Sequence, residues 1–196
     1  SQVQPETVRR GFDGGAPQPA VRDPENISLA GTFFALILLG TLAEEDEASL
    51  GQAYRQVNRI ATLRWLKTLQ RPDGSFGEVV RADGVVSGGR DMRYCYMAAA
   101  TRWILRGHEA GPELDIDVDG LVRHVRRSQA YDGGIAESHM GEGQAGYAYC
   151  AVAALALLDR AAGDTARPNH YLESGIPDIP ALVHWLVCRQ LVHTED

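Results

Sequence analysis

Side chains that could carry chemistry gather at three places in this chain of 196 residues. Glu137, His139 and Glu142 lie in a glycine-rich stretch and could by residue type hold a metal ion. Aspartates alternate with apolar residues in D-I-D-V-D, residues 115–119. Arg93 follows Asp91 by two positions, where a helix is expected to start. A cation gains nothing from the helix dipole there, so Arg93 is interpreted as an anion-binding residue.

The first two groups also have simpler interpretations. No sequence feature fixes the geometry of residues 137–142, so a flexible loop is preferred to a metal site. The aspartates of residues 115–119 suit the solvated start of a helix. His124 and His184 fall on amphipathic segments and are expected at the surface or at an interface. The three cysteines, Cys95, Cys150 and Cys188, are odd in number and lie in apolar contexts, which predicts reduced core thiols in a cytosolic protein.

Composition bounds the possible partners. The chain is 44% hydrophobic and 23% charged, with a formal net charge of −7. This balance argues against a general nucleic-acid surface and leaves an anionic ligand to a local basic pocket. The start carries no apolar signal peptide. Ile27 to Leu42 falls short of the about 20 apolar residues that span a membrane, so no membrane span is expected.

The elements that must position these groups are helices of two kinds. Three stretches are apolar or small on most sides and predict enclosed helices: Ile27 to Leu42, Asp91 to Leu105 and Ala145 to Leu158. Three others have one apolar face and predict half-exposed helices: Leu50 to Leu69, Leu121 to Ser128 and Ile179 to Leu191. Residues 44–47, 79–89, 114–120 and 161–169 are expected to be connectors or loops.

The two kinds of helix alternate with a period near 60 residues. Gln70, Gln129 and Gln190 recur at this spacing, and Asp73 and Asp132 follow two of them in Gly-containing turns. The period predicts an all-α protein, an α/α toroid with the enclosed helices as its inner layer. We expect an irregular lead-in over residues 1–22, with a first turn at Arg9 to Gly15. Residues 23–196 form one domain of repeats, apparently a segment of a longer ring.

Four stretches carry a family resemblance. The turn Q-R-P-D-G-S-F, Gln70 to Phe76, resembles the repeat of protein prenyltransferase β subunits and triterpene cyclases. D-M-R-Y-C-Y at residues 91–96 and R-R-S-Q-A-Y-D-G-G-I at residues 126–135 are similar to prenyltransferase β signatures, as is the following G-Y-A-Y-C-A-V-A-A-L. The similarity is strongest to geranylgeranyltransferase type I β subunits of fungal type. The acidic motif of the cyclases is absent, because residues 115–119 contain no adjacent acidic pair.

The resemblance implies an activity. Such β subunits work with an α subunit in the cytoplasm and transfer an isoprenoid from geranylgeranyl diphosphate to the cysteine thiol of CaaX-terminated small GTPases. In the family, zinc holds that thiol as the thiolate. Farnesyl and Rab-type β subunits are weaker alternatives.

The family's site residues carry over in part. By resemblance, Arg93 lies between the lipid and the peptide's carboxylate end, and Tyr96 and Cys150 line the isoprenoid slot. Gly146 and Tyr147 match the pair that begins the inner helix, whose N–H groups can help to hold diphosphate. Plain core packing would equally explain Tyr96 and Cys150.

The departures from the pattern concern charge and metal. Gln144 stands where the family has a diphosphate-binding histidine, and His139 is a nearby substitute. The family's zinc ligands begin with an Asp two residues before a Cys, and no cysteine here has this spacing. A further diphosphate-binding segment would come after Asp196. We therefore expect no zinc site in this chain and no turnover by the chain alone. A non-catalytic helical scaffold that binds a lipid or a partner remains the second hypothesis.

Overall fold

The computed structural model describes residues 27–43, 47–162, 167 and 169–190. The expected lead-in of residues 1–22 and its turn lie outside this part. The helices are α1 (Leu29–Leu42), α2 (Glu47–Ala53), α3 (Arg59–Thr68), α4 (Met92–Ile104), α5 (Val118–Arg127), α6 (Ala145–Ala162), α7 (His170–Gly175) and α8 (Ile179–Val187), with a short 3-10 helix at Gly107–Glu109. A two-stranded hairpin, β1 (Val79–Val80) and β2 (Val86–Ser87), precedes α4.

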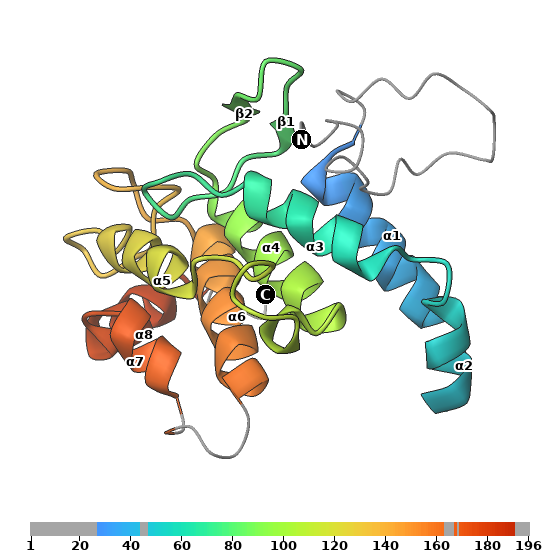
Figure 1. The fold of residues 1–196 in the computed structure, drawn as a ribbon. Coiled ribbons are helices and arrows are strands. Elements are labelled where there is room, and N and C mark those ends of the chain that lie inside the picture. Colours follow the sequence, from blue (N-terminus) through green and yellow to red (C-terminus); the bar gives the residue numbers. More distant parts are fainter. Residues whose placement is uncertain (1–26, 44–46, 163–166, 168, 191–196) are drawn as a thin grey trace, which may run out of the picture.

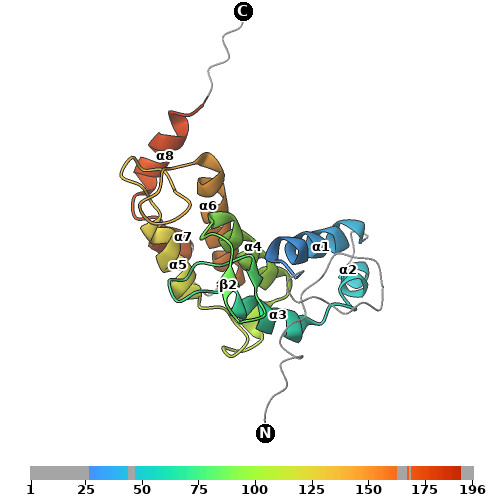
Figure 2. The same cartoon turned by 90° about the horizontal axis from the view of Figure 1, so that it is seen from above.

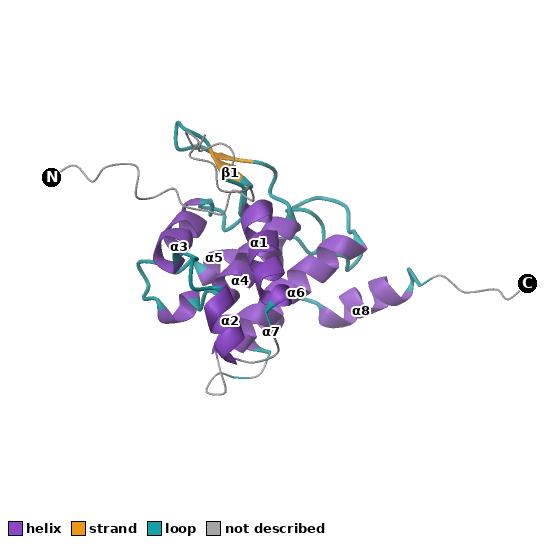
Figure 3. Ribbon diagram, turned by 90° about the vertical axis from the view of Figure 1, so that its right-hand side faces the viewer, coloured by secondary structure: helices purple, strands orange, loops and turns teal. Residues whose placement is uncertain are grey.

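The helices form two layers. The inner helices α1, α4 and α6 all begin at the end of the molecule that is uppermost in Figure 1, where the hairpin also lies. α4 packs between α1 and α6, while α3 packs on α4 and α5 packs on α6 and α7. Figure 2, seen from above, shows the elements following one another along an arc. Figure 3 shows that nearly all of the regular structure is helical. The predicted α/α arrangement is therefore confirmed.

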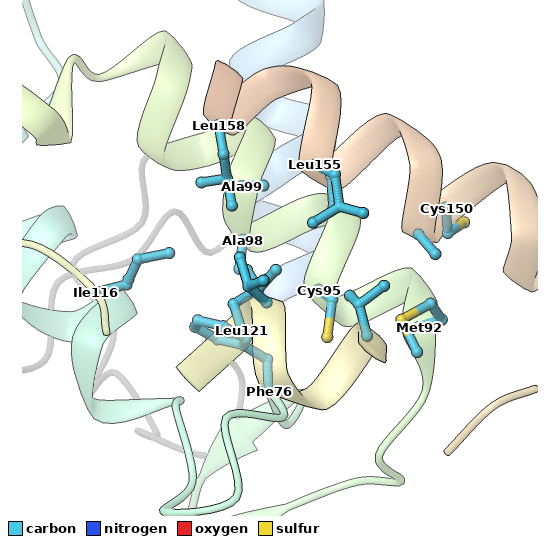
Figure 4. Packing of buried hydrophobic residues seen from close by; sticks show 14 of the residues in the cluster. Phe76, Met92, Cys95, Ala98, Ala99, Ile116, Leu121, Cys150, Leu155 and Leu158 are labelled. Atoms are coloured by element: carbon cyan, nitrogen blue, oxygen red, sulfur yellow. The ribbon is translucent and has the colours of Figure 1, made fainter. Parts of the chain in front are cut away.

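Small residues let the two central inner helices approach closely. Ala98 and Ala99 on α4 and Ala151 and Ala154 on α6 are at most 1% exposed. Larger side chains from the turns, connectors and outer helices close this core from the sides (Figure 4): Phe76, Ile116 and Leu121. A buried side chain of this size removes apolar surface worth about 1.5–3 kcal/mol. The core therefore holds inner and outer layers together.

The repeat is visible as a recurring contact. Gln70 accepts a hydrogen bond from the backbone N–H of Asp117 at 2.7 Å and donates to its carbonyl at 2.8 Å. Gln129 makes the same pair of bonds to Asp178, at 2.9 and 2.8 Å. Asp117 and Asp178 in turn cap α5 and α8. Gln70 and Gln129 thus each join one repeat to the N-cap residue of the next outer helix.

Several predicted boundaries differ from the structure. The helix predicted over residues 50–69 is two helices, α2 and α3. The chain breaks between them because Tyr54 donates to the carbonyl of Leu36 and Asn58 caps α3. The loop predicted over residues 79–89 contains the β1–β2 hairpin, and α8 ends at Val187. Two smaller elements, α7 and the 3-10 helix, had no sequence prediction; α7 has only six residues and no amphipathic pattern to reveal it.

Burial corrects three further predictions. α1 is not enclosed: Phe34, Leu38 and Leu42 are 59%, 58% and 74% exposed, because α1 lies at the edge of the described array. His124 was expected at the surface or at an interface but is 5% exposed, because its ring packs against the connector before α4, 3.3 Å from the carbonyl of Arg90. Cys188 is exposed rather than part of the core. In the described part of the chain, no helix is long and apolar enough to cross a membrane.

Candidate functional site

The residues assigned by sequence lie at the starts of two neighbouring inner helices. Arg93 is in the first turn of α4, and Gly146 and Tyr147 are in the first turn of α6. Tyr96 and Cys150 lie one turn further along the same helices. α4 and α6 begin at the same end and pack against one another (Figure 1). Arg93 and Tyr147 lie close enough for each charge to affect the pKa of the other, and Tyr96 on α4 contacts the Tyr149 ring on α6. These positions therefore belong to one site.

An ion pair organises the start of α4. The Asp91 carboxylate caps the helix by accepting from the Arg93 N–H at 2.8 Å. It also accepts from Nε of Arg93, at 3.0 and 2.8 Å, and from the second guanidinium nitrogen. The Asp91 side chain is 8% exposed and that of Arg93 is 63% exposed. Hydrogen bonding to Asp91 raises the pKa of Arg93 above its usual range. One side of the guanidinium is thus anchored and the rest faces solvent.

The start of α6 brings a phenol and a thiol beside this pair. Burial, followed by the charges of Asp91 and Glu137, raises the pKa of Tyr147. Burial also raises the pKa of Cys150, which is 7% exposed. Both groups are therefore neutral at pH 7, and Tyr147 can donate a hydrogen bond to an anion. Cys150 is a packing residue in this environment and not a nucleophile.

Gln144 occupies the residue immediately before α6. Its carbonyl accepts the first helical hydrogen bond, from the N–H of Ala148 at 3.0 Å, and its own N–H donates to Ile135 at 2.9 Å. Its exposed side chain folds over the first turn, with Oε1 3.2 Å from where a Cβ on Gly146 would lie. The amide is a neutral group at the rim of the site.

A row of aromatic rings continues from Tyr96 along both neighbouring helices. The Phe33 and Tyr96 rings are 5.5 Å apart, and those of Tyr96 and Tyr149 are 5.9 Å apart, both edge to face. An apolar groove of about 340 Å³ opens between α1 and α4, lined by Phe33, Tyr96 and Trp103 among others. The sequence analysis did not assign Phe33, Tyr149 and Trp103 to the site, because aromatic residues in apolar helices are usually part of the core.

The loop before α6 offers no ready metal site. His139 hydrogen-bonds through Nδ1 to the carbonyl of Arg127, at the end of α5, at 3.0 Å. Within the described residues, His, Cys, Asp and Glu side chains form no group of three or more that could hold a metal ion. The zinc implied by the family resemblance is therefore assigned to none of these residues.

The described helices form a two-layer α/α array, with a cation and hydrogen-bond donors at the starts of two adjacent inner helices. Comparisons with known proteins identify the family that has this α/α fold. A family model, the prenyltransferase alpha-alpha toroid domain, matches residues 2–195. The chain therefore belongs to this family.

Its relatives are β subunits of protein prenyltransferases. It is 28% identical over 190 residues to the farnesyltransferase subunit beta of Pyricularia oryzae, and 27% identical over 166 residues to that of Pisum sativum. These matches cover 92% and 83% of this chain, but it spans only 32% of each relative. A solved structure of Candida albicans protein geranylgeranyltransferase-I complexed with GGPP is 25% identical, with a TM-score of 0.64 over 89% of this chain and 44% of that one.

Proposed function

We propose that this chain forms part of a protein geranylgeranyltransferase type I β subunit. Its substrate is geranylgeranyl diphosphate, and its acceptor is the cysteine of a C-terminal CaaX sequence on a small GTPase. A prenyltransferase α subunit is the proposed partner and the cytoplasm the proposed location. As a domain, we assign residues 23–196 to the toroid and residues 1–22 to a lead-in.

The observation that carries this proposal is the position of Arg93 relative to the aromatic row. A lipid diphosphate has an anionic head and an apolar tail. Arg93 and the Tyr147 hydroxyl offer charge-assisted and neutral hydrogen bonds to the head at the starts of α4 and α6. Tyr96 and Phe33 lead from there into the apolar groove, which suits the tail. One site therefore matches both halves of the ligand.

These residues would favour the departure of the diphosphate. In the transfer, the acceptor thiol loses its proton to solvent, the bond between C1 of the isoprenoid and the diphosphate oxygen breaks, and a bond from the thiolate sulfur to C1 forms. Negative charge grows on the departing oxygen, where fixed donors such as Arg93 and Tyr147 stabilise it most. Gly146 adds no side chain beside the α6 backbone, where the exposed Gln144 amide lies and would have to contact or give way to the head group. No step is assigned to zinc, because the described residues do not form its site.

The choice of lipid rests on two observations that point in different directions. The solved relative is a geranylgeranyltransferase, whereas the two sequence relatives are farnesyltransferase subunits. We favour the longer lipid because the aromatic row continues past Tyr96 into an open groove rather than ending at a wall.

A non-catalytic lipid-binding scaffold is the second candidate, favoured by the local charge. Of the residues assigned to the site, only Arg93 is cationic, and Asp91 already neutralises it. Gln144 adds a neutral amide. Such a site could hold a lipid diphosphate weakly without driving its cleavage.

The test is transfer by the full chain in complex with its partner subunit. Geranylgeranyl and farnesyl diphosphate are each offered with CaaX peptides that end in Leu or in Met, because the last residue separates the two specificities. Geranylgeranylation of the Leu peptide supports the proposal, and farnesylation of the Met peptide contradicts the type I assignment. Lipid binding without transfer to either peptide supports the scaffold.

A further inference from the structure

The connector that leads into α4 is held by side chains from two other elements. Arg71, in the turn after α3, donates to the carbonyls of Gly88 and Gly89 at 2.7 and 3.0 Å. Asp73 in the same turn accepts from Nε of Arg90 at 2.7 Å. The ring of His124 on α5 lies 3.3 Å from the Arg90 carbonyl. Three consecutive residues before Asp91 are thus tied to the repeat turn and the outer layer.

Arg71 is the centre of this arrangement. Besides the two glycine carbonyls, its guanidinium donates to the carbonyl of Phe76 at 2.9 Å and, at 3.5 Å, to that of Val86 in β2. It passes close over Gly77, where a Cβ would lie 2.9 Å from a guanidinium nitrogen. A planar fork with five N–H donors suits carbonyls in separate segments, whereas the compact ammonium of lysine lacks this shape. Arg71 therefore joins the turn, the hairpin and the connector.

Gly88 and Gly89 make such a restraint necessary. Gly88 has a φ of +95°, and two successive glycines have more backbone freedom than any other pair of residues. Without the guanidinium, this connector would sample many directions. Asp91 and Arg93 follow within four residues, so their direction depends on how the connector is held.

The next repeat holds the chain before its inner helix, α6, in a different way. Ala130 occupies the position after its turn glutamine that Arg71 occupies after Gln70. The chain before α6 is held mainly by its own backbone, through the bridge between Ala136 and Gly143 and the bond from Gln144 N–H to Ile135. Its side-chain restraint comes from within the loop, where His139 bonds to the carbonyl of Arg127 on α5. An arginine from the turn is thus a feature of the α4 start and not a requirement of the repeat.

We propose that Arg71 is a positioning residue for substrate binding: by holding the Gly88 and Gly89 carbonyls, it sets the direction in which Arg93 faces the start of α6. This inference rests on the proposed function, because it assigns Arg93 to the lipid diphosphate. Arg71 itself acts through the connector and does not touch the substrate.

Hydrogen exchange tests the positioning step without any ligand. In the full chain, in the complex in which it purifies, Arg71→Ala should speed exchange of the amides of residues 89–94 about tenfold. Exchange in the first turn of α6 should stay unchanged. Arg64→Ala, an exposed arginine on α3, is the matched control and should alter neither region. Arg71→Lys keeps the charge but not the fork, should give an intermediate rate, and serves in place of Arg71→Ala if that variant does not fold.

Binding of geranylgeranyl diphosphate tests the link to Arg93. Arg71→Ala should weaken binding about tenfold in the parent, but less than about twofold in an Arg93→Ala background, because both changes remove the same contact. A purely structural role would not produce this non-additivity.

The outcomes separate the two proposals. If the parent binds no lipid diphosphate, the proposed function is wrong, while exchange still decides whether Arg71 holds the connector. Unchanged exchange at residues 89–94 would overturn the inference. So would an Arg71→Ala effect of equal size with and without Arg93.

Discussion

Asp91 and Arg93 hold one another at the first turn of α4, with the Asp91 carboxylate accepting from both the backbone N–H and the side chain of Arg93. This contact explains how a cation is tolerated beside the positive end of a helix dipole, because the carboxylate compensates both charges. The pair is also asymmetric: the aspartate is buried and the guanidinium is exposed. Arg93 is thus oriented by Asp91, while the exposed part of its guanidinium can still bind an anion.

Arg93→Ala should lower lipid diphosphate affinity more than stability. Loss of a charge-assisted hydrogen bond to an anion costs about 1.5–3 kcal/mol, or roughly ten- to hundredfold in Kd. Loss of the ion pair should cost about 1 kcal/mol, because solvent screens the exposed guanidinium and the buried Asp91 carboxylate keeps its bond from the residue-93 backbone N–H. Titration of the ligand and thermal melting measure the two effects. A large fall in Tm with unchanged affinity would make Arg93 a structural residue only.

Gln144→His should tighten geranylgeranyl diphosphate binding, and more so at pH 6 than at pH 8. An exposed imidazole is largely protonated at the lower pH and adds charge to its hydrogen bond. Titrations at both pH values measure the effect, with Gln190→His, at an exposed position three residues after α8, as a control for added charge. Equal affinities for parent and variant at both pH values would remove Gln144 from the site.

Gln129→Ala should destabilise the fold by about 1–2 kcal/mol, because it removes both bonds to Asp178 at the start of α8. Denaturant unfolding measures the free energy. Gln190→Ala is the matched control, since that amide's contact within the described residues is a 3.4 Å bond to Leu186, four residues earlier in α8. A similar loss in both variants would contradict a specific role for the bond between repeats.

Asp73→Asn should flatten the acid side of the stability profile. Burial opposes ionisation of Asp73, but hydrogen bonds from Ser75 and Arg90 outweigh it and lower the pKa from 3.8 to about 2. A lowered folded-state pKa stabilises the protein above about pH 4, and this contribution is lost as the pH falls towards 2. Because the side chain is 36% exposed, we expect about 1 kcal/mol. Unfolding free energies measured between about pH 2 and about pH 5 compare the parent with Asp73→Asn. If the unfolding free energies of parent and variant changed in parallel with pH, a lowered pKa of Asp73 would be contradicted.

Cys188 should react with iodoacetamide in the native protein, while Cys95 and Cys150 should react only after unfolding. Cys188 is exposed on α8, whereas burial raises the pKa of Cys95 to about 12 and also that of Cys150. Thiolate is the reactive form, so both burial and protonation protect these two. Mass spectrometry of labelled peptides identifies the sites, with Cys188→Ser as the control. Rapid native labelling of Cys95 would contradict the packing of α4 on α6.

Local patterns in the sequence were enough to predict the longer helices and their repeat, but not the short α7 or the break between α2 and α3. Runs of apolar residues predicted the cores of α1, α4 and α6, and the recurring turn glutamines predicted the period, because side-chain polarity and turn chemistry are properties of short segments. The same patterns located Arg93 and Tyr147 at helix starts. Their proximity then followed from the parallel course of the inner helices.

Contacts between distant segments had to come from the tertiary structure. His124 is buried and α1 is open on one side because of what packs against each helix, which amphipathicity does not specify. Arg71 and Gly88 are 17 residues apart, and nothing in the turn sequence distinguishes this arginine from an exposed one. The sequence by itself determined which segments are helical and how they repeat. Only the tertiary structure decided which side chains restrain the site, because those bonds depend on where loops from different repeats meet.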